Sequence, residues 1–471
     1  MFGFGFQYGK VLGLSLGALL ASVFRKRVVA DGGTMEGEGC VTSELNRLNK
    51  IGILDDVSLA MIPSGYKASK LYSVVPSDGS GDLSFSRSTT GTRVNADGLI
   101  ESVAINEPRL DFTGGGCGKY LFEPQRINLI TYSEDFSNAY WTKSGATVVS
   151  GQTSPSADSP TGAFKLLEDT SNGSHEITPS VPVSNGETYT LSAYFKSSDR
   201  NIAIAFAGTR MASGNGGSGA DNYSIVNLLD GSILVNFNQV KVIDLLNGYY
   251  RVSNTFTVGT SGGSFDILIK IANGTSRSYT GNGTSGVDIF AAQLESGSYA
   301  TSYTPTVGST VTRTADSSST SGLSSVINSV EGVLYFEIQW DMSSGGSNRR
   351  ISLSDGTTSN RILIQNVSVN ANVLQFYVIN SSGVSTDFAV TLDDITANNK
   401  IAFKYKLNDF CVFVNGVKVL TDTSGTTFTA NTLNRFGFDG GSGNFPFYGK
   451  VKGLGIFNIL TDTQMAALTT I

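Results

Sequence analysis

Alternation of apolar and polar residues runs through most of the chain and predicts a protein built mainly of β-strands. In the segment 188–195, Tyr189, Leu191, Ala193 and Phe195 fall on one face of the pattern. Further strands are predicted at 201–206, 224–227, 249–257, 264–272 and 287–294. The phrase Tyr249-Tyr250-Arg251 lies inside one of them, so at least one of these tyrosines is expected to be buried.

The C-terminal part has the same character. Apolar strands are predicted at 333–340 and 401–406, and a hairpin covers 409–420. Asn415 and Gly416 separate its two strands, and this dipeptide is typical of a type I′ turn. Thr461 or Asp462 can cap a short final helix.

Between the N-terminus and this β-rich body the pattern changes. Residues 31–39 read as a linker, and 42–50 as a helix in which Thr42 or Ser43 caps and Leu45 and Leu48 share one face. A second short helix is expected at 55–61. Period-two alternation returns at 70–112, with a turn at 95–98, and the Ser/Thr-rich segment 316–322 is expected to be a linker.

Residues 11–24 form an uncharged run that ends at three basic residues, 25–27. As a helix the run spans roughly 21 Å, short of the ~30 Å hydrocarbon core of a bilayer. Three interpretations remain open: a plug buried by a partner protein, a membrane-contacting anchor over 11–27, or an ordinary core helix. The first two make this end the attachment point, with candidate residues Phe2, Phe4, Phe6, Leu12, Leu14, Leu16, Leu19, Leu20 and Phe24.

Composition narrows the class of function. The formal net charge of −6 argues against binding to nucleic acid. The three cysteines show no disulfide framework and no CxxC metal pattern, and Cys411 is expected to be a buried free thiol, in keeping with assembly in a reducing cytoplasm. His175 is the sole histidine, and its loop-like setting predicts a plain surface role.

Several phrases carry a family resemblance. Residues 123–141, 292–306 and 311–316 resemble the opening and closing phrases of a jelly-roll module found in bacteriophage virion proteins of the tail-fibre and carbohydrate-binding type. The phrases 71–76, 80–87 and 92–101 resemble segments that precede this module. Residues 401–406, 414–419 and 447–457 are similar to concanavalin A-like, laminin-G-like lectin sandwiches. The resemblance implies surface modules that bind, without chemistry.

The expected fold is therefore mainly β, with an N-terminal anchor and short helices followed by two antiparallel β-sandwich (jelly-roll) domains. The expected divisions are an attachment segment and linker (1–39), a small helical and β connector (40–125), a carbohydrate-binding-module-like jelly roll (126–318) and a concanavalin A-like sandwich (319–471).

Candidate sugar-binding residues are Trp141, Tyr140, Trp340 and Asp341, although core or rim packing is the competing interpretation of each aromatic side chain. The glycine-rich segment 208–222 is expected to be a mobile loop at one rim of the jelly roll. No cofactor is expected apart from a possible structural calcium ion. Candidate ligands are Asp439 and Asn444, with Asp288 and Glu295, against a plain role in turns. Glu337 stands alone in its strand, and the Glu-x-Asp-x-x-Glu strand of concanavalin A-like glycosidases is missing, so no enzyme activity is expected.

The function that follows is a phage virion appendage, such as a tail fibre, spike or head fibre. It is expected to assemble in the host cytoplasm, lie at the virion surface, attach to other virion proteins through its N-terminus and bind a host-surface glycan or receptor. A homotrimer is implied by the resemblance. The alternatives are a capsid decoration or adaptor protein with a structural role, and a polysaccharide depolymerase.

Overall fold

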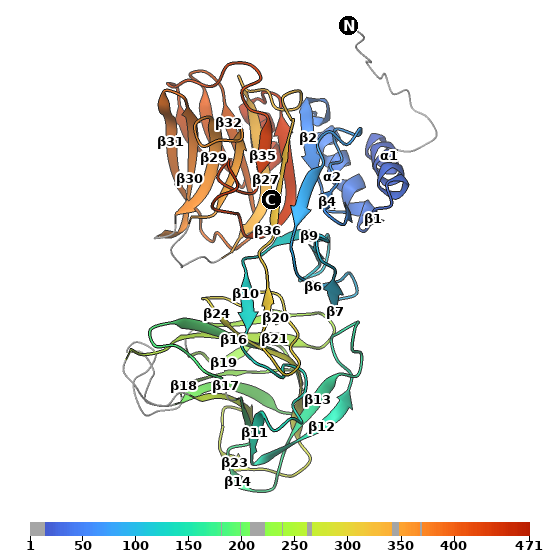
Figure 1. Ribbon diagram of the computed structural model, residues 1–471, viewed down its shortest axis with the longest axis vertical. Helices are drawn as coiled ribbons and strands as arrows, with labels where there is room; N and C mark the ends of the chain where they lie inside the picture. The colour runs from blue at the N-terminus through green and yellow to red at the C-terminus, as the bar shows by residue number, and fades with distance from the viewer. Residues whose placement is uncertain are drawn as a thin grey trace.

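Two β-sandwiches account for most of the molecule, which confirms the expected fold class (Figure 1). The computed structural model describes residues 15–471 apart from 180, 198, 208–221, 238, 261–265, 342–347 and 368–369. The expected rim loop at 208–222 therefore lies almost entirely outside the described residues. In Figure 1 the sandwich drawn in green lies below the one drawn in orange and red, and the helices flank the latter.

The jelly roll contains two antiparallel sheets that enclose one core, and all six strands predicted between 188 and 294 are present. One sheet has the order β11 (Trp141–Ser144), β15 (Glu176–Pro179), β22 (Asp266–Ala272), β17 (Asn201–Ala207), β18 (Asn222–Val226), β19 (Ile233–Val235). The other has the order β12 (Ala146–Gln152), β13 (Ala163–Glu168), β24 (Gly286–Ser296), β16 (Thr188–Ser197), β21 (Tyr250–Thr257), β20 (Gln239–Asp244). Leu191, Ala193 and Phe195 face the core as the alternation predicts, and Tyr249 is buried.

The second sandwich combines residues from both ends of the sequence. Its first sheet has the order β1 (Thr34–Met35), β3 (Gly65–Lys67), β4 (Lys70–Leu71), β5 (Leu83–Ser86), β26 (Ser317–Ser321), β35 (Arg435–Gly437), β28 (Arg350–Ser354), β29 (Arg361–Val367), β30 (Asn370–Asn380), β31 (Gly383–Thr391). Its second sheet has the order β34 (Val417–Asp422), β33 (Phe410–Val414), β32 (Asn399–Tyr405), β27 (Gly332–Trp340), β36 (Gly449–Phe457), β9 (Lys119–Phe122), β8 (Leu110–Asp111). β2 (Val57–Met61) also pairs with β36.

Segments expected as a connector and a linker are thus strands of this second sandwich. β5 pairs with β26, and both β2 and β9 pair with β36. Leu59, Met61, Phe85 and Phe122 belong to the same hydrophobic core as the C-terminal strands. Another part of residues 40–125, which includes Leu45 and Tyr72, forms a smaller cluster with residues 21–28. The Ser/Thr-rich segment expected as a linker is β26, whose backbone is paired on both sides by β5 and β35.

The jelly roll is inserted into this second sandwich. β10 (Arg126–Asn128) carries the chain into it, and β25 (Val311–Arg313) carries the chain out. The two strands pair antiparallel, with Arg126 opposite Arg313. Figure 1 shows β10 running between the two sandwiches.

Short hairpins complete the β structure. β6 (Gly91–Val94) and β7 (Ile100–Val103) pair around the predicted turn at 95–98. β14 (Asn172–Gly173) and β23 (Tyr279–Thr280) form a further ladder. In the turn between β33 and β34, Asn415 and Gly416 have φ values of 49° and 87°, as a type I′ turn requires.

The helices confirm two predictions, one of them with an earlier start, and correct a third. α3 (Asp462–Thr469) is capped by Thr461, whose side chain forms a capping box with Gln464. α2 (Glu38–Lys50) begins before the expected caps Thr42 and Ser43, with Gly37 at its N-cap, and so takes up the end of the expected linker. The expected second helix is instead a single 3₁₀ turn, η1 (Leu54–Asp56), followed by strand β2, because pairing with β36 overrides the local helical pattern.

α1 (Leu16–Ala30) packs against α2, so the described part of the N-terminal segment is a core helix of this chain. Phe24 is 1% exposed and lies in one cluster with Val28 and Leu45, which excludes it as a residue that a partner contacts directly. Leu16, Leu19 and Leu20 are half-buried. The other attachment candidates, Phe2, Phe4, Phe6, Leu12 and Leu14, lie outside the described residues. Within the described chain, no helix is long and apolar enough to cross a membrane.

Two expectations about sulfur and imidazole groups are wrong. Cys40 and Cys117 form a disulfide between α2 and the β8–β9 loop, which their separation of 77 residues in sequence conceals. Such a bond persists in oxidising surroundings rather than in a reducing cytoplasm. His175 is fully buried and not at the surface, with Nδ1 2.6 Å from the carbonyl oxygen of Gly145. Cys411 is a buried free thiol, as predicted.

Candidate binding site between the two sandwiches

A buried cluster of charges lies where the chain passes from one sandwich to the other. Arg87, Arg109 and Arg313 all have fully buried side chains, and they surround the carboxylates of Glu123 and Asp316. Arg109 is 2.6 Å from Glu123 and also pairs with Asp316. Arg87 is 3.2 Å from Asp316, and Arg313 is 3.4 Å from Glu123.

Backbone and hydroxyl groups complete this charge cluster. The Glu123 N–H donates to Asp316 at 2.8 Å, and the Ser302 N–H and hydroxyl donate to Glu123 at 2.7 and 2.6 Å. Burial raises the pKa of Glu123, but Arg109 and Arg313 outweigh it and hold that pKa well below its usual range. Arg87, Glu123, Arg313 and Asp316 stand in the phrases 80–87, 123–141 and 311–316, so these phrases supply most of the charge cluster.

Beside this cluster lies a cleft of about 360 Å³ that both sandwiches line. The jelly roll contributes Lys241 and Arg251 from β20 and β21, and the second sandwich contributes Gln339 and Trp340 from β27. A neighbouring cavity of about 180 Å³ shares Arg251 and further residues with it. The charge cluster fixes the relative position of the two walls.

Three residues of the cleft carry buried polar atoms that make no hydrogen bond with the described residues: Arg251 Nε, Trp340 Nε1 and Asp341 Oδ1. Arg251 is held by Ser192 Oγ at 2.9 Å and the carbonyl oxygen of Thr301 at 2.6 Å. The Trp340 ring is 2% exposed and packs edge-on against Phe447, with 4.9 Å between ring centroids.

Asp341 has a perturbed acidity. The Tyr299 hydroxyl donates to Asp341 Oδ2, while Oδ1 has Arg349 Nε at 4.0 Å. Burial raises the pKa of Asp341 to about 6, because desolvation exceeds the stabilising effect of the Tyr299 hydrogen bond and the nearby arginines. Near neutral pH this carboxylate is ionised, and within the described part of the chain no donor lies within hydrogen-bond distance of its Oδ1.

The structure brings together two of the predicted sugar-binding residues and separates the other two. Trp340 and Asp341 line the cleft, although the Trp340 ring is too buried for a sugar to stack on it. Trp141 lies in the jelly-roll core, is 1% exposed and donates from Nε1 to the Tyr132 carbonyl oxygen at 2.9 Å. Tyr140 is half-buried, edge-on to Trp141. Of the two interpretations of Trp141, core packing is therefore the one that the structure supports, and Tyr140 packs against it.

The candidate calcium ligands have other partners. Arg435 holds both carboxylate oxygens of Asp439, at 2.9 and 2.5 Å, and the Asn444 amide lies 3.3 Å from Ser442. Glu295 accepts from Thr301 and Gln293, and Asp288 of β24 lies directly opposite Lys165 of β13. Among the residues that the structure describes, no group of three or more His, Cys, Asp or Glu side chains could hold a metal ion.

Sequence reasoning missed Arg251, Lys241 and Tyr299 as cleft residues. Arg251 stands in the phrase Tyr249-Tyr250-Arg251, which signalled a strand but not the direction of its arginine. Lys241 lies on β20, which the pattern did not predict at all. Contact between β20 and the second sandwich depends on the insertion of the jelly roll. The residues around β20 do not predict this insertion.

No family model and no curated protein matches the chain. Among solved structures, it is similar to the CBM40 module of the Ruminococcus gnavus IT-sialidase bound to α2,3-sialyllactose (16% identity, 30% of this chain and 83% of that chain, TM-score 0.26). It is also similar to domains LG4–5 of the mouse laminin α1 chain (12% identity, 60% of this chain and 85% of that chain, TM-score 0.21). The tandem CBM22-1–CBM22-2 of Paenibacillus barcinonensis Xyn10C matches at 11% identity, over 70% of this chain and 98% of that chain, with a TM-score of 0.22. At these TM-scores the likenesses carry no argument about what this chain binds.

Proposed function

We propose that this protein is an appendage of a bacteriophage virion that binds a host-surface glycan in the cleft between its two sandwiches. The virion setting is supported by the phrases at 71–101, 123–141 and 292–316, which resemble phage tail-fibre and carbohydrate-binding proteins. The proposal places the protein at the virion surface, as a homo-oligomer without enzymatic activity.

The observation that carries the glycan site is the set of unsatisfied polar atoms in the cleft. Arg251 Nε and Trp340 Nε1 are donors, and Asp341 Oδ1 is an acceptor. An unsatisfied buried polar atom costs about 1–3 kcal/mol, which a bound partner recovers. A sugar hydroxyl both donates and accepts, so a ligand with several hydroxyls can satisfy donors and acceptors in one site. The exposed Lys241 extends the donor set at the rim.

A glycan array probed with the purified protein tests this site, followed by titration calorimetry of the strongest ligand. Trp340→Phe retains a packed ring but removes the Nε1 donor, and Lys241→Ala removes the rim cation. We expect each variant to bind about ten-fold more weakly, the effect of losing roughly 1.4 kcal/mol. Lys50→Ala, at the exposed end of α2, is the matched control. Equal binding by Trp340→Phe, Lys241→Ala and the wild type would refute the cleft as the site.

The same preparation separates the alternatives. A blank array, together with virions that lose stability without the protein, favours a capsid decoration or adaptor role. Release of reducing ends from host polysaccharide favours a depolymerase. Light scattering in solution checks the proposed trimer.

Attachment through the N-terminus is tested separately. Deletion of residues 1–14 leaves α1 and its contacts with α2 intact, whereas deletion of 1–30 would also remove the buried Phe24. We expect the shorter deletion to prevent incorporation into particles while the isolated protein keeps its melting temperature. Full incorporation of that variant would overturn the attachment proposal.

A further inference from the structure

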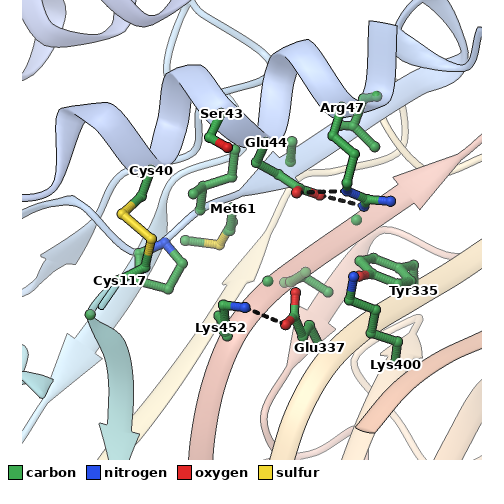
Figure 2. Close-up of a pocket in the computed structure, with 18 of the residues that line it drawn as sticks. Cys40, Ser43, Glu44, Arg47, Met61, Cys117, Tyr335, Glu337, Lys400 and Lys452 are labelled. Atoms are coloured by element: carbon green, nitrogen blue, oxygen red, sulfur yellow. Dashed lines mark hydrogen bonds and ion pairs between the residues drawn. A yellow bond between two sulfur atoms is a disulfide. The ribbon is translucent and has the colours of Figure 1, made fainter. Parts of the chain in front are cut away.

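A second pocket, of about 230 Å³, lies between helix α2 and the outer face of the sheet that contains β27, β32 and β36. Figure 2 shows charged side chains of α2 on one side of it and those of the sheet on the other, with the Cys40–Cys117 disulfide at one end. The pocket shares no lining residue with the cleft between the sandwiches.

The pocket exists because β36 carries glycine where it faces α2. Gly453 and Gly455 are two residues apart in this strand and both line the pocket. Alternate residues of a strand project to the same face, so the two positions leave adjacent space without side chains. Apolar walls come from Leu48, Pro63 and Phe457, whereas the side chains of Met61 and Leu454 belong to the sandwich core.

The carboxylates of the pocket are already supplied with donors. Glu337 accepts from Lys452 Nζ at 2.6 Å and from Asn398 Nδ2 at 2.7 Å. Burial raises the pKa of Glu337, but these two hydrogen bonds outweigh it and keep that pKa below its usual value. Glu44 accepts two hydrogen bonds from Arg47, at 2.8 and 2.5 Å.

The pocket also carries hydrogen-bond donors, and these outnumber the acceptors that the pocket offers them. Tyr335 Oη lines the pocket, the residue is 3% exposed, and this hydroxyl finds no acceptor among the described residues, since its neighbour Arg47 can only donate. Burial raises the pKa of Tyr335 well above its usual value, so its hydroxyl keeps the proton that it can donate. Lys400 Nζ donates to the Thr470 carbonyl oxygen at 2.9 Å. An ammonium group has three N–H donors, so Lys400 and Lys452 retain donor capacity.

We propose that this pocket binds a small organic acid, with one carboxylate and a compact apolar body. The described lining contains the cations Arg47, Lys400 and Lys452 against the two carboxylates, so it favours a ligand of negative charge. Tyr335 and Lys400 would donate to the carboxylate, and the apolar walls would hold the body. This site is independent of the glycan site, so either proposal can fail without the other.

Two probe pairs test the proposal on the full chain: benzoate against benzamide, and hexanoate against hexanamide. Each pair keeps the apolar body and replaces the anionic carboxylate by a neutral amide. Ligand-observed NMR and calorimetry at pH 7.5 should show at least one acid binding ten-fold or more tightly than its amide. If neither acid binds more tightly than its amide, the proposal is overturned.

Two variants locate the binding. Tyr335→Phe removes only the unsatisfied hydroxyl, so we expect about ten-fold weaker acid binding with an unchanged or higher melting temperature. Gly453→Leu fills the pocket and should abolish binding. A Cβ at Gly453 would meet only ordinary contacts, 3.7 Å from Glu337 Cβ and 3.9 Å from Tyr335 Cε1. Gly173→Leu, at an open position of the jelly roll, is the control. Undiminished acid binding by Tyr335→Phe would overturn the assignment even if Gly453→Leu does not fold.

Discussion

Arg109 and Glu123 form an ion pair 2.6 Å long, with the arginine side chain fully buried, beside the two strands that join the sandwiches. Both residues also engage Asp316, which lies 193 residues beyond Glu123 in the sequence. One charge cluster therefore ties together segments that precede and follow the jelly roll.

Asp316→Asn should destabilise the protein strongly. The substitution leaves Arg87, Arg109 and Arg313 buried with one carboxylate in place of two. Removing one partner from a buried ion pair costs about 3–5 kcal/mol. Urea unfolding followed by circular dichroism measures the change, with Asp97→Asn in the exposed turn of the β6–β7 hairpin as the control. Equal stability of the two variants would show that the cluster contributes nothing.

Loss of the Cys40–Cys117 disulfide should also lower stability. In the loop-entropy account, a bond closing a loop of this length contributes about 4 kcal/mol by restricting the unfolded chain. We expect the double variant Cys40→Ser/Cys117→Ser to melt at a lower temperature than the wild type. A reducing agent should lower the melting temperature of the wild type but not that of the double variant. If a reducing agent leaves the melting temperature of the wild type unchanged, the predicted contribution of the disulfide is contradicted. Cys411 is buried and should react with a thiol reagent only on unfolding.

Asp341 makes stability depend on pH in a direction opposite to that of most carboxylates. Its pKa of about 6 in the folded protein exceeds the usual 3.8, so the folded state holds the proton more tightly. The contribution of Asp341 to stability therefore decreases as pH rises from about 4 to 6, by up to about 3 kcal/mol.

Asp341→Asn should remove this dependence. At pH 7.5 we expect the variant to be more stable than the wild type, and at pH 4 we expect the two to be equal. Denaturant titrations at both pH values measure the difference. A difference of the same size at both pH values would attribute the effect to packing rather than to ionisation.

Trp141→Ala should act on folding and not on ligand recognition. The ring is 1% exposed and lies 4.9 Å from Phe136, centroid to centroid. Truncating a buried tryptophan costs about 3–5 kcal/mol. Trp141→Phe should cost less, and the glycan affinity of the folded fraction should stay unchanged in both variants. A selective loss of affinity with normal stability would restore Trp141 as a sugar platform.

Local patterns were a good guide to strands and a poor guide to their partners. Alternation at 188–195 and the turn at Asn415 and Gly416 predicted the observed elements because both are properties of neighbouring residues. The pairing of Val57 with Phe457 joins positions about 400 residues apart, and nothing near Val57 reports it. For that reason the helix expected at 55–61 is replaced by the turn η1 and the strand β2.

For charged and polar groups, too, the sequence indicates single residues but not their distant partners. Cys40 and Cys117 are brought to a Cα–Cα distance of 5.9 Å only by the placement of α2 beside the β8–β9 loop. Trp340 and Asp341 were identifiable because an aromatic residue and a carboxylate end a strong strand. Their neighbours across the cleft, Lys241 and Arg251, belong to the other sandwich, so the site could be recognised only in part from the sequence.

The pairing of β10 with β25 has an evolutionary consequence. Arg126 and Arg313 stand opposite each other, so the polypeptide leaves and re-enters the surrounding scaffold within about one strand spacing, roughly 5 Å. A gene segment between these codons can be exchanged for another that encodes a domain with adjacent termini, and the scaffold strands on either side still meet. Recombination at this one position can therefore replace the whole jelly roll while keeping the second sandwich into which it is inserted.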